Sequence, residues 1–399
     1  MRRPGKTLRQ QWPVWWIALS VVLPVLLLVA WPWIQTTQPW GIRLFFDDYD
    51  LKVYFHSSRW VVDGGTLYRD VFSEYPCVAN LLFAGVRLLS EWVVPLSHPF
   101  DRFSWMWMSL AWVLYIQLLR IVRGEKQSLW IWIAPAPIYF ALLRYDFYPT
   151  LTCFLALLEW KKGRWHAGTL WFSLCIALKG YGLFLMPSLF VYFFVNLGLR
   201  QAIKLSTLCL GAFLLSHLAV IAWAGWEGLM MPYQFHMTRS NNGESTYDVL
   251  EFALLGLGVS SETRTEFLQV IAQGIVPKIG LIATSLVAAA LVPRTFQELV
   301  RSMLIGVVGF ISTSIFYSPQ FVLWIAGVAT FSESNLVRVG SAALNWLSFA
   351  HFPVTYDLRP HYQKPYKNMV AVVASVRLLL LAVAFRRPRH SKASRGKAN

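Results

Sequence analysis

The chain has 399 residues, of which 56% are hydrophobic and only 14% are charged. Water-soluble domains usually carry about 25% charged residues, so this composition excludes an ordinary soluble protein. The net charge of +16 would suit a nucleic-acid partner, but the basic residues gather in short segments beside apolar runs. Such placement is the positive-inside pattern of membrane proteins, and we therefore expect no nucleic-acid binding.

Apolar runs recur along the whole chain and approach the roughly 20 residues that a helix needs to cross a bilayer. We expect spans at about 14–34, 77–95, 103–122, 128–144, 147–160, 166–180, 181–198, 204–224, 266–292, 300–317, 320–336, 339–352 and 368–385. The pattern predicts an all-α, multi-pass integral membrane protein with about 12 or 13 spans and one domain, 1–399. No small-residue cleavage site closely follows the first run, which favours an uncleaved anchor.

The orientation follows from the positive-inside rule. Basic residues in 1–13, in 161–164 and in the tail 386–399 place both termini in the cytoplasm. The segments 35–76 and 225–265 then become the large outer loops. The basic turn between 120 and 126 conflicts with this count, so the topology around 77–127 stays open.

The first outer loop carries three carboxylates, Asp47, Asp48 and Asp50, just beyond the first span. The apolar residues from Asp50 to Val62 predict a helix on the membrane surface. A partly desolvated carboxylate at such a surface suits a general base. A solvated acidic loop is the alternative.

Two other outer span ends carry charges. Lys179 lies between apolar runs, where its cation needs an anion or a water-filled cavity; the alternative is a snorkelling lysine in a hairpin turn. Arg144 and Asp146 form a second charged pair, which local ion pairing explains equally well.

The loop after the span 204–224 is the densest in polar groups. His236, Arg239 and Glu244 lie close together there with Asp248, and arginine is suited to capturing phosphate through two hydrogen bonds. A salt-bridged structural loop is the alternative. Gln320, between two apolar runs, could bond a sugar hydroxyl or simply end a helix.

Four short stretches occur in an order that resembles one family. They are Asp50-Leu51-Lys52-Val53-Tyr54 followed by Gly64-Gly65-Thr66-Leu67-Tyr68 and Tyr75-Pro76; Ala177-Leu178-Lys179-Gly180-Tyr181; His236-Met237-Thr238-Arg239 with Glu244-Ser245; and Ser318-Pro319-Gln320-Phe321. The chain thereby resembles the polyprenol-phosphate-mannose-dependent mannosyltransferases of the GT-C superfamily (glycosyltransferase family 87) over roughly residues 14–350. It departs at Cys77 and Gly182, where the family has proline, and at Arg144-Tyr145-Asp146, which replaces a Gly-Gln-x-Asn signature.

The resemblance implies a GT-C-type helical bundle in a bacterial plasma membrane. It implies transfer of a hexose, most often mannose, from a polyprenyl-phosphate donor to a lipid or glycan acceptor at the outer face, with inversion and without a cofactor or metal. Asp50 would be the general base and Asp48 the second choice. The donor phosphate and sugar would meet residues from five segments: Lys179, Arg239, His236, Glu244, Gln320, Tyr54 and Asp146.

The four cysteines lie far apart, without metal-ligand spacing: Cys77, Cys153, Cys175 and Cys209. The cluster of Asp47, Asp48 and Asp50 nevertheless leaves a divalent cation open. Two other classes also remain open, a transporter or lipid flippase and an inactive relative of the family. A transporter would need polar residues through the depth of the membrane.

Overall fold

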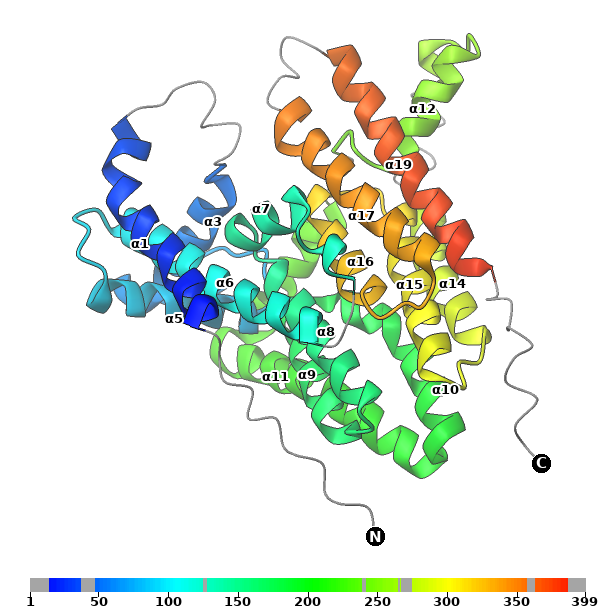
Figure 1. The fold of residues 1–399 in the computed structure, drawn as a ribbon, viewed down its shortest axis with the longest axis horizontal. Helices are drawn as coiled ribbons and strands as arrows, with labels where there is room; N and C mark the ends of the chain where they lie inside the picture. Colours follow the sequence, from blue (N-terminus) through cyan, green and yellow to red (C-terminus); the bar gives the residue numbers. More distant parts are fainter. Residues whose placement is uncertain are drawn as a thin grey trace.

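A computed structural model describes residues 14–36, 47–124, 128–238, 242–264, 266, 275–356 and 363–386. Within these ranges the chain is helical and contains no strand, only an isolated bridge between Leu67 and Val71. The helices pack around one another in a bundle, with α12 (Thr246–Gly256) and the first turns of α19 (Gln363–Phe385) together at one end (Figure 1). The predicted all-α class is thereby confirmed for the described residues.

The first half of the bundle runs from α1 to α9. Its elements are α1 (Val14–Thr36), α3 (Tyr49–Ser57), α4 (Trp60–Asp63), α5 (Cys77–Val93), α6 (Pro99–Gly124), η1 (Leu129–Ile131), α7 (Pro135–Leu143), α8 (Phe147–Lys161) and α9 (Trp165–Leu178).

The second half begins with a short tight helix and leads to α19. Its further elements are η2 (Gly180–Leu185), α10 (Met186–Leu197), α11 (Leu199–Thr238), α14 (Ile275–Ala290), α15 (Phe296–Thr313), η3 (Pro319–Phe321), α16 (Val322–Ala329), α17 (Asn335–Phe349) and η4 (Ala350–Thr355).

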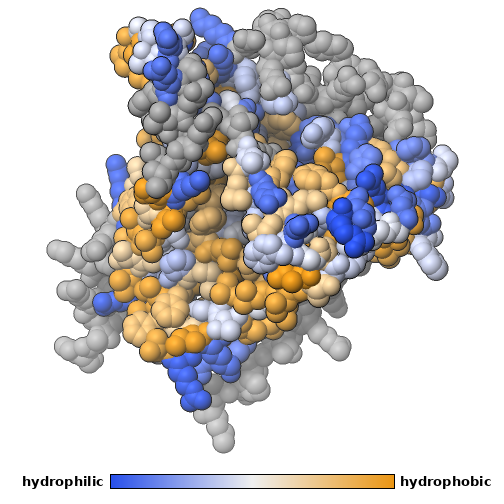
Figure 2. All heavy atoms as spheres, turned by 180° about the vertical axis from the view of Figure 1, so that it is seen from behind, coloured by the Kyte–Doolittle hydropathy of each residue, from blue (hydrophilic) through white to orange (hydrophobic). Residues whose placement is uncertain are grey.

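Five described helical segments are long and apolar enough to cross a membrane, and they indicate an integral membrane protein. They are Pro99–Gly124, Gly180–Leu197, Leu199–Thr238, Phe296–Thr313 and Lys364–Phe385. Apolar side chains gather over the middle of one face of the molecule and hydrophilic ones toward its edges (Figure 2). Shorter apolar helices, such as Trp165–Leu178 and Pro277–Ala290, account for further predicted runs.

Two predicted spans are not single helices. The run 128–144 is divided into η1 and α7, because α7 starts afresh at Pro135, a residue that favours the first helical position and lacks the N–H that would continue an earlier helix. The run 320–336 contains η3 and then α16, which ends at Ala329. Neither run is therefore one continuous helix over its whole predicted length.

The longest helix extends well beyond the predicted span 204–224. α11 reaches from Leu199 to Thr238 and bends at Gly225, whose φ of 74° is left-handed. Glycine adopts this conformation at little cost because it has no Cβ. The bend lets one apolar segment continue into the predicted outer loop and carry His236 toward the first outer loop.

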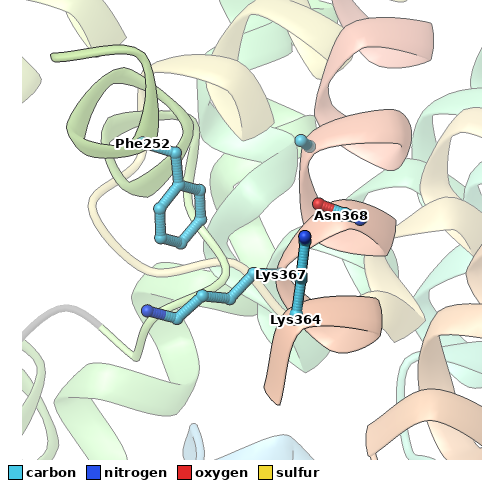
Figure 3. A pocket seen from close by; sticks show the side chains of 5 residues that line it. Phe252, Lys364, Lys367 and Asn368 are labelled. Carbon is cyan, nitrogen blue, oxygen red and sulfur yellow. The ribbon is translucent and has the colours of Figure 1, made fainter. Parts of the chain in front are cut away.

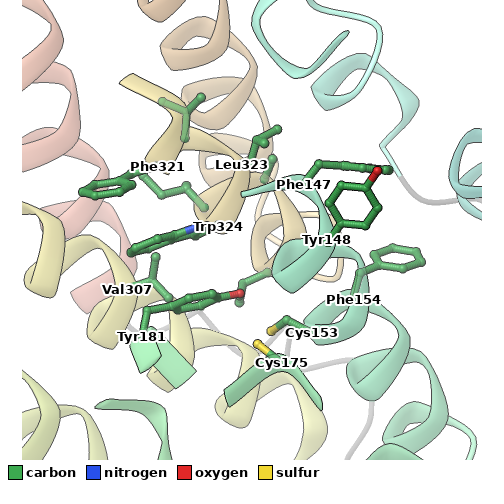
Figure 4. Packing of buried hydrophobic residues seen from close by; sticks show 14 of the residues in the cluster. Phe147, Tyr148, Cys153, Phe154, Cys175, Tyr181, Val307, Phe321, Leu323 and Trp324 are labelled. Carbon is green, nitrogen blue, oxygen red and sulfur yellow. The ribbon is translucent and has the colours of Figure 1, made fainter. Parts of the chain in front are cut away.

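The centre of the core is a stack of aromatic rings from three different elements (Figure 4). Trp324 of α16 lies with its ring centroid 4.2 Å from Tyr181 of η2 and 4.2 Å from Phe321 of η3. Such offset stacking stabilises by about 0.5–1.5 kcal/mol per pair beyond the burial itself. The stack packs η2 and η3 against α16.

Candidate functional site

The acidic helix of the first outer loop packs against the bundle along one side. α3 begins at Tyr49, and its residues Leu51 and Tyr54 are fully buried. Their spacing of three puts them on one helical face, which contacts α5 and α6. Asp50 lies next to this face, and its side chain contacts Arg144, a residue between α7 and α8.

Asp50 forms an ion pair with a buried arginine that lies 94 positions away in sequence. The Arg144 Nη1 is 3.0 Å from the Asp50 Oδ2, and its Nη2 is 2.6 Å from the Asp47 Oδ2. The side chain of Arg144 is 6% exposed, while Asp50 retains 20%. Part of the Asp50 carboxylate therefore stays accessible to solvent, while the Arg144 guanidinium is enclosed.

Tyr54 fixes the same carboxylate from one helical turn further on. Its hydroxyl donates to the Asp50 Oδ2 at 3.3 Å and accepts from the Tyr145 N–H at 2.9 Å. Burial raises the pKa of Asp50 above its ordinary value, and the positive charge of Arg144 opposes that rise. Asp50 is thus a positioned carboxyl group with a higher proton affinity than a free aspartate.

Asp48 lies differently, although it precedes Asp50 by only two residues. Its carboxylate pairs with Lys52 at 2.9 Å, and the two side chains are 34% and 55% exposed. Exposed pairs of this kind stabilise by at most about 1 kcal/mol. Of the two aspartates, only Asp50 joins the buried network.

Lys179 also has an internal partner. Its Nζ is 2.7 Å and 2.8 Å from the two carboxylate oxygens of Asp146, which is 1% exposed, whereas Lys179 is 22% exposed. The Trp324 indole N–H donates to the Asp146 Oδ1 at 2.8 Å. The lysine needed an anion, as the sequence indicated, and the protein itself supplies one.

Three aromatic rings flank the Lys179 ammonium, whose side chain remains 22% exposed. It lies 5.2 Å from the ring centre of Trp324, 5.4 Å from that of Phe321 and 5.6 Å from that of Tyr145. Cations within about 6 Å of such faces are stabilised electrostatically. These contacts and the Asp146 carboxylate hold the lysine in place at the edge of an apolar core.

Local pairing of Arg144 with Asp146, the alternative left open for these two charges, is not what the structure shows, because each has a partner in another segment. Arg144 has extended backbone angles at the end of α7, and its side chain reaches α3. Asp146 already has helical angles at the start of α8, which turn its side chain toward Lys179. Tyr145 lies between them, and its hydroxyl donates to the Leu178 carbonyl. The two ion pairs thereby meet at Tyr145, with three carboxylates against two cations.

The segment after α4 contributes an aromatic wall. The Asn80 side-chain amide donates to the Tyr75 carbonyl at 2.9 Å and to the Tyr68 hydroxyl at 3.1 Å. This holds the Tyr75 ring with its centroid 5.5 Å from Tyr54 and 5.4 Å from Tyr145. Sequence reasoning noted the Tyr75-Pro76 stretch but not its contact with both tyrosines.

Glu244 belongs to a second buried network. It accepts a hydrogen bond from the Tyr366 hydroxyl at 2.7 Å, and the His351 Nε2 lies 3.7 Å from the same carboxylate oxygen. Asn242 donates to the Tyr317 carbonyl at 2.5 Å. Ser245 and Asp248 form a capping box at the start of α12, so Asp248 is structural.

An arginine that the sequence reasoning overlooked completes this network. Arg377 of α19 is fully buried, and its guanidinium carbon lies 3.8 Å from the ring centre of Tyr317. None of its three nitrogens has a hydrogen-bond partner among the described residues. The signal was present, since this arginine interrupts the apolar run 368–385 and charged residues in spans are costly.

The two networks are neighbours. The Arg144 guanidinium carbon lies 5.2 Å from the ring centre of Phe352, next to His351 in the chain. The ring centroids of Tyr317 and Phe321 are 6.0 Å apart, which connects the Glu244 network to Lys179. Four predicted site residues, Asp50, Tyr54, Asp146 and Lys179, lie in the first network, and Glu244 lies beside it.

The remaining predicted site residues are more peripheral. The His236 Nε2 lies 3.0 Å from the Glu74 carbonyl oxygen, which places the end of α11 beside the Tyr75 segment. Gln320 is half-buried within η3. Arg239 lies outside the described residues.

Comparison with known proteins yields no relative. No family model, no curated protein and no solved structure matches this chain. Among the described residues, no group of three or more His, Cys, Asp and Glu side chains is arranged to hold a metal ion. The two buried networks and the apolar helices around them are therefore the features of this chain that bear on its function.

Proposed function

We propose that the chain is a membrane glycosyltransferase that moves a hexose from a polyprenyl-phosphate donor to a hydroxyl of a lipid or glycan acceptor. The observation that carries the proposal is the position of Asp50. Its carboxylate is 20% exposed, is held by Arg144 and Tyr54, and lies in a network that continues through Tyr145 to Lys179. A positioned, partly desolvated carboxylate suits a general base.

The proposed reaction is a single displacement. The acceptor oxygen forms a bond to the anomeric carbon while the bond from that carbon to the phosphate oxygen breaks. The Asp50 carboxylate takes the proton of the acceptor hydroxyl, and the bond electrons leave with the polyprenyl phosphate. Attack opposite to the leaving group inverts the anomeric centre, as with inverting glycosidases that use a carboxylate base.

Negative charge grows on the departing phosphate, and a fixed cation stabilises that change without reorganising. Lys179 is our first candidate for this role. Its ammonium has three N–H donors, and the two Asp146 oxygens at 2.7 Å and 2.8 Å occupy two of them. The third N–H is available to a phosphate oxygen. Arg239 is the second candidate, on the resemblance of its sequence motif.

The Asp146 carboxylate would serve this role rather than oppose it. An isolated ammonium at the edge of an apolar core loses hydration and tends to release its proton. The Asp146 carboxylate, which accepts a hydrogen bond from the Trp324 indole, holds the lysine oriented before a donor arrives. Asp146 and Trp324 are therefore positioning residues. Because the sequence resembles polyprenol-phosphate-mannose-dependent mannosyltransferases, mannose is the first sugar to test.

One observation favours a second candidate function, a lipid flippase. Arg377 is fully buried near the middle of the apolar segment Lys364–Phe385, and charged groups at membrane depth often line transport pathways. A flippase would move a lipid-linked sugar without breaking its glycosidic bond. Release of polyprenyl phosphate from the donor therefore separates the two functions.

The test is sugar transfer from synthetic, radiolabelled polyprenyl-phosphate mannose to a membrane extract by the purified protein. Asp50→Asn keeps the shape of the side chain but cannot accept the proton, so turnover should fall by roughly two to four orders of magnitude. Asp48→Asn is the matched control and should retain turnover, because Asp48 faces Lys52. Equal turnover in Asp50→Asn and the parent, or transfer lost only in Asp48→Asn, would refute Asp50 as the base.

A further inference from the structure

A groove separates α12 from the beginning of α19 (Figure 3). Its volume is about 350 Å³, and it is lined by Phe252 of α12 and by Lys364, Lys367, Asn368 and Ala371 of α19. The Lys367 ammonium lies 5.0 Å from the ring centre of Phe252. The groove therefore combines two cations and an amide with apolar surface.

The lining residues of α19 follow helical spacing. Lys364, Lys367, Asn368 and Ala371 are separated by three, four and seven residues from the first, which puts them on one face. Tyr366, Val370, Val373 and Arg377 are buried and occupy the opposite face, toward the bundle. The helix thus keeps its groove face apart from its packing face.

The two lysines lie where the helix itself disfavours them. Cations near a helix N-terminus oppose the helix dipole, and like charges three residues apart repel. α19 has no acidic residue in its first turn. Within the part of the chain that the structure describes, no carboxylate forms an ion pair with Lys364 or Lys367. A bound anion would compensate both charges at once.

The groove also lies at the start of an apolar segment. Lys364 is the first residue of the candidate span Lys364–Phe385, and lysines at such boundaries attract anionic lipid headgroups. Phe252 and Ala371 offer apolar contact next to the lysines. A volume of 350 Å³ holds a headgroup and the first carbons of its chain, since a water molecule occupies about 30 Å³.

We propose that this groove binds the phosphate headgroup of an anionic membrane lipid. Lys364 and Lys367 would contact the phosphate oxygens as point charges, and Asn368 would donate to the same headgroup. Phe252 would cover the adjoining carbons. This site does not depend on sugar transfer, because it lies on the opposite face of α19 from Tyr366 and Glu244.

The experiment is native mass spectrometry of the full chain, titrated with phosphatidylglycerol in detergent. The double variant Lys364→Gln and Lys367→Gln should bind this lipid about thirtyfold more weakly, from the loss of two near-surface cations. Lys278→Gln is the matched control, because Lys278 is an exposed lysine in the first turn of α14; it should bind like the parent. Equal lipid affinity in the double variant and the parent would overturn the proposal.

Two further arms identify the ligand. Phosphatidylcholine, whose headgroup has no net charge, should bind much more weakly than phosphatidylglycerol, and equal binding would refute recognition of an anion. Inorganic phosphate at millimolar concentration should not displace the lipid. Full displacement would show a site for free phosphate and would overturn the assignment to a lipid. Phe252→Ala should weaken lipid binding, and retained binding would refute the apolar contact.

Discussion

The Asp146 carboxylate lies with both oxygens within 2.8 Å of the Lys179 ammonium, although the two residues are 33 positions apart. The pair joins the start of α8 to the end of α9 at the edge of the apolar core. Removing either charge therefore affects the fold as well as any ligand bound there.

Lys179→Met should destabilise the protein because it leaves the Asp146 carboxylate buried without its partner. Breaking a buried pair in this way costs about 3–5 kcal/mol. The double variant Asp146→Asn with Lys179→Met should recover most of that loss. Thermal unfolding of the detergent-solubilised proteins measures both. Equal stabilities of the single variant and the parent would contradict a structural role for the pair.

The expected loss of stability on Lys179→Met means that a phosphate-binding role of Lys179 has to be tested in a variant that still folds. The single variant Lys179→Met affects folding as well as donor binding. The double variant removes the cation without leaving a buried carboxylate unpaired. If Lys179 binds the donor phosphate, the double variant should fold and yet bind the donor more weakly. A folded double variant with parental donor affinity would leave that role to Arg239.

Trp324→Phe should cost stability through a single lost donor. The indole N–H donates to the ionised Asp146 at 2.8 Å, and hydrogen bonds to charged groups contribute about 1.5–3 kcal/mol. Trp132→Phe is the matched control, since the Trp132 indole is equally buried but donates to the neutral Thr330 hydroxyl at 2.8 Å. Its loss should be about 0.5–1.5 kcal/mol. Chemical denaturation that ranks the two in reverse would contradict an ionised Asp146.

Sugar transfer should fall at low pH because a base acts only when ionised. Burial raises the pKa of Asp50 and Arg144 opposes that rise, so Arg144→Gln should move the acid limb of the pH–rate profile to higher pH. Lys52→Met should leave the limb unchanged, because Lys52 pairs with Asp48. An acid limb that stays in place or moves to lower pH in Arg144→Gln would rule out the Asp50–Arg144 pair.

The raised pKa of Asp50 also predicts that stability changes with pH in the opposite direction to sugar transfer. The native pKa of Asp50 lies above the ordinary value of 3.8, so the folded state binds this proton more tightly than the unfolded state. The contribution of Asp50 to stability therefore declines as pH rises from 3.8 through the native pKa. Asp50→Asn should remove that decline, which pH-dependent thermal unfolding measures.

Membrane orientation can be tested with single cysteines in a cysteine-free background. Arg59→Cys and Thr238→Cys, both exposed positions, should react with an impermeant thiol reagent from the same side of the membrane. Lys162→Cys, also exposed, should react only from the other side. If Thr238→Cys reacts from the same side as Lys162→Cys, the end of α11 and the first outer loop lie on opposite sides of the membrane.

The sequence was most informative about which residues are unusual, and least informative about their partners. Asp50, Asp146 and Lys179 stand out because charges beside apolar runs need compensation. Their partners come from distant segments, and no local spacing encodes the contact of Arg144 with α3. The departure from the family pattern at Arg144-Tyr145-Asp146 also meant that the resemblance gave Arg144 no role and did not indicate that Asp146 pairs with Lys179.

Helix boundaries were similarly limited by what hydropathy reports. The run 128–144 is apolar through its middle, but Pro135 starts a new helix within it. The run 320–336 is helical only as far as Ala329, where α16 ends. Hydropathy measures the solvent that a segment prefers, and backbone chemistry decides where a helix begins. The buried Arg377 was missed for a related reason, since one charge hardly alters the average over a long apolar run.

Arg377 has a consequence for how the protein is made. An arginine near the middle of a helix adds on the order of 3 kcal/mol to the cost of inserting that helix on its own, whereas in the finished fold this side chain packs on Tyr317 near Glu244. Both residues precede α19 in the chain, so translation provides the arginine's surroundings before the arginine itself emerges. The last helix should then integrate stably only beside helices already in place. Truncations that remove the segment around Tyr317 should leave α19 poorly inserted during synthesis.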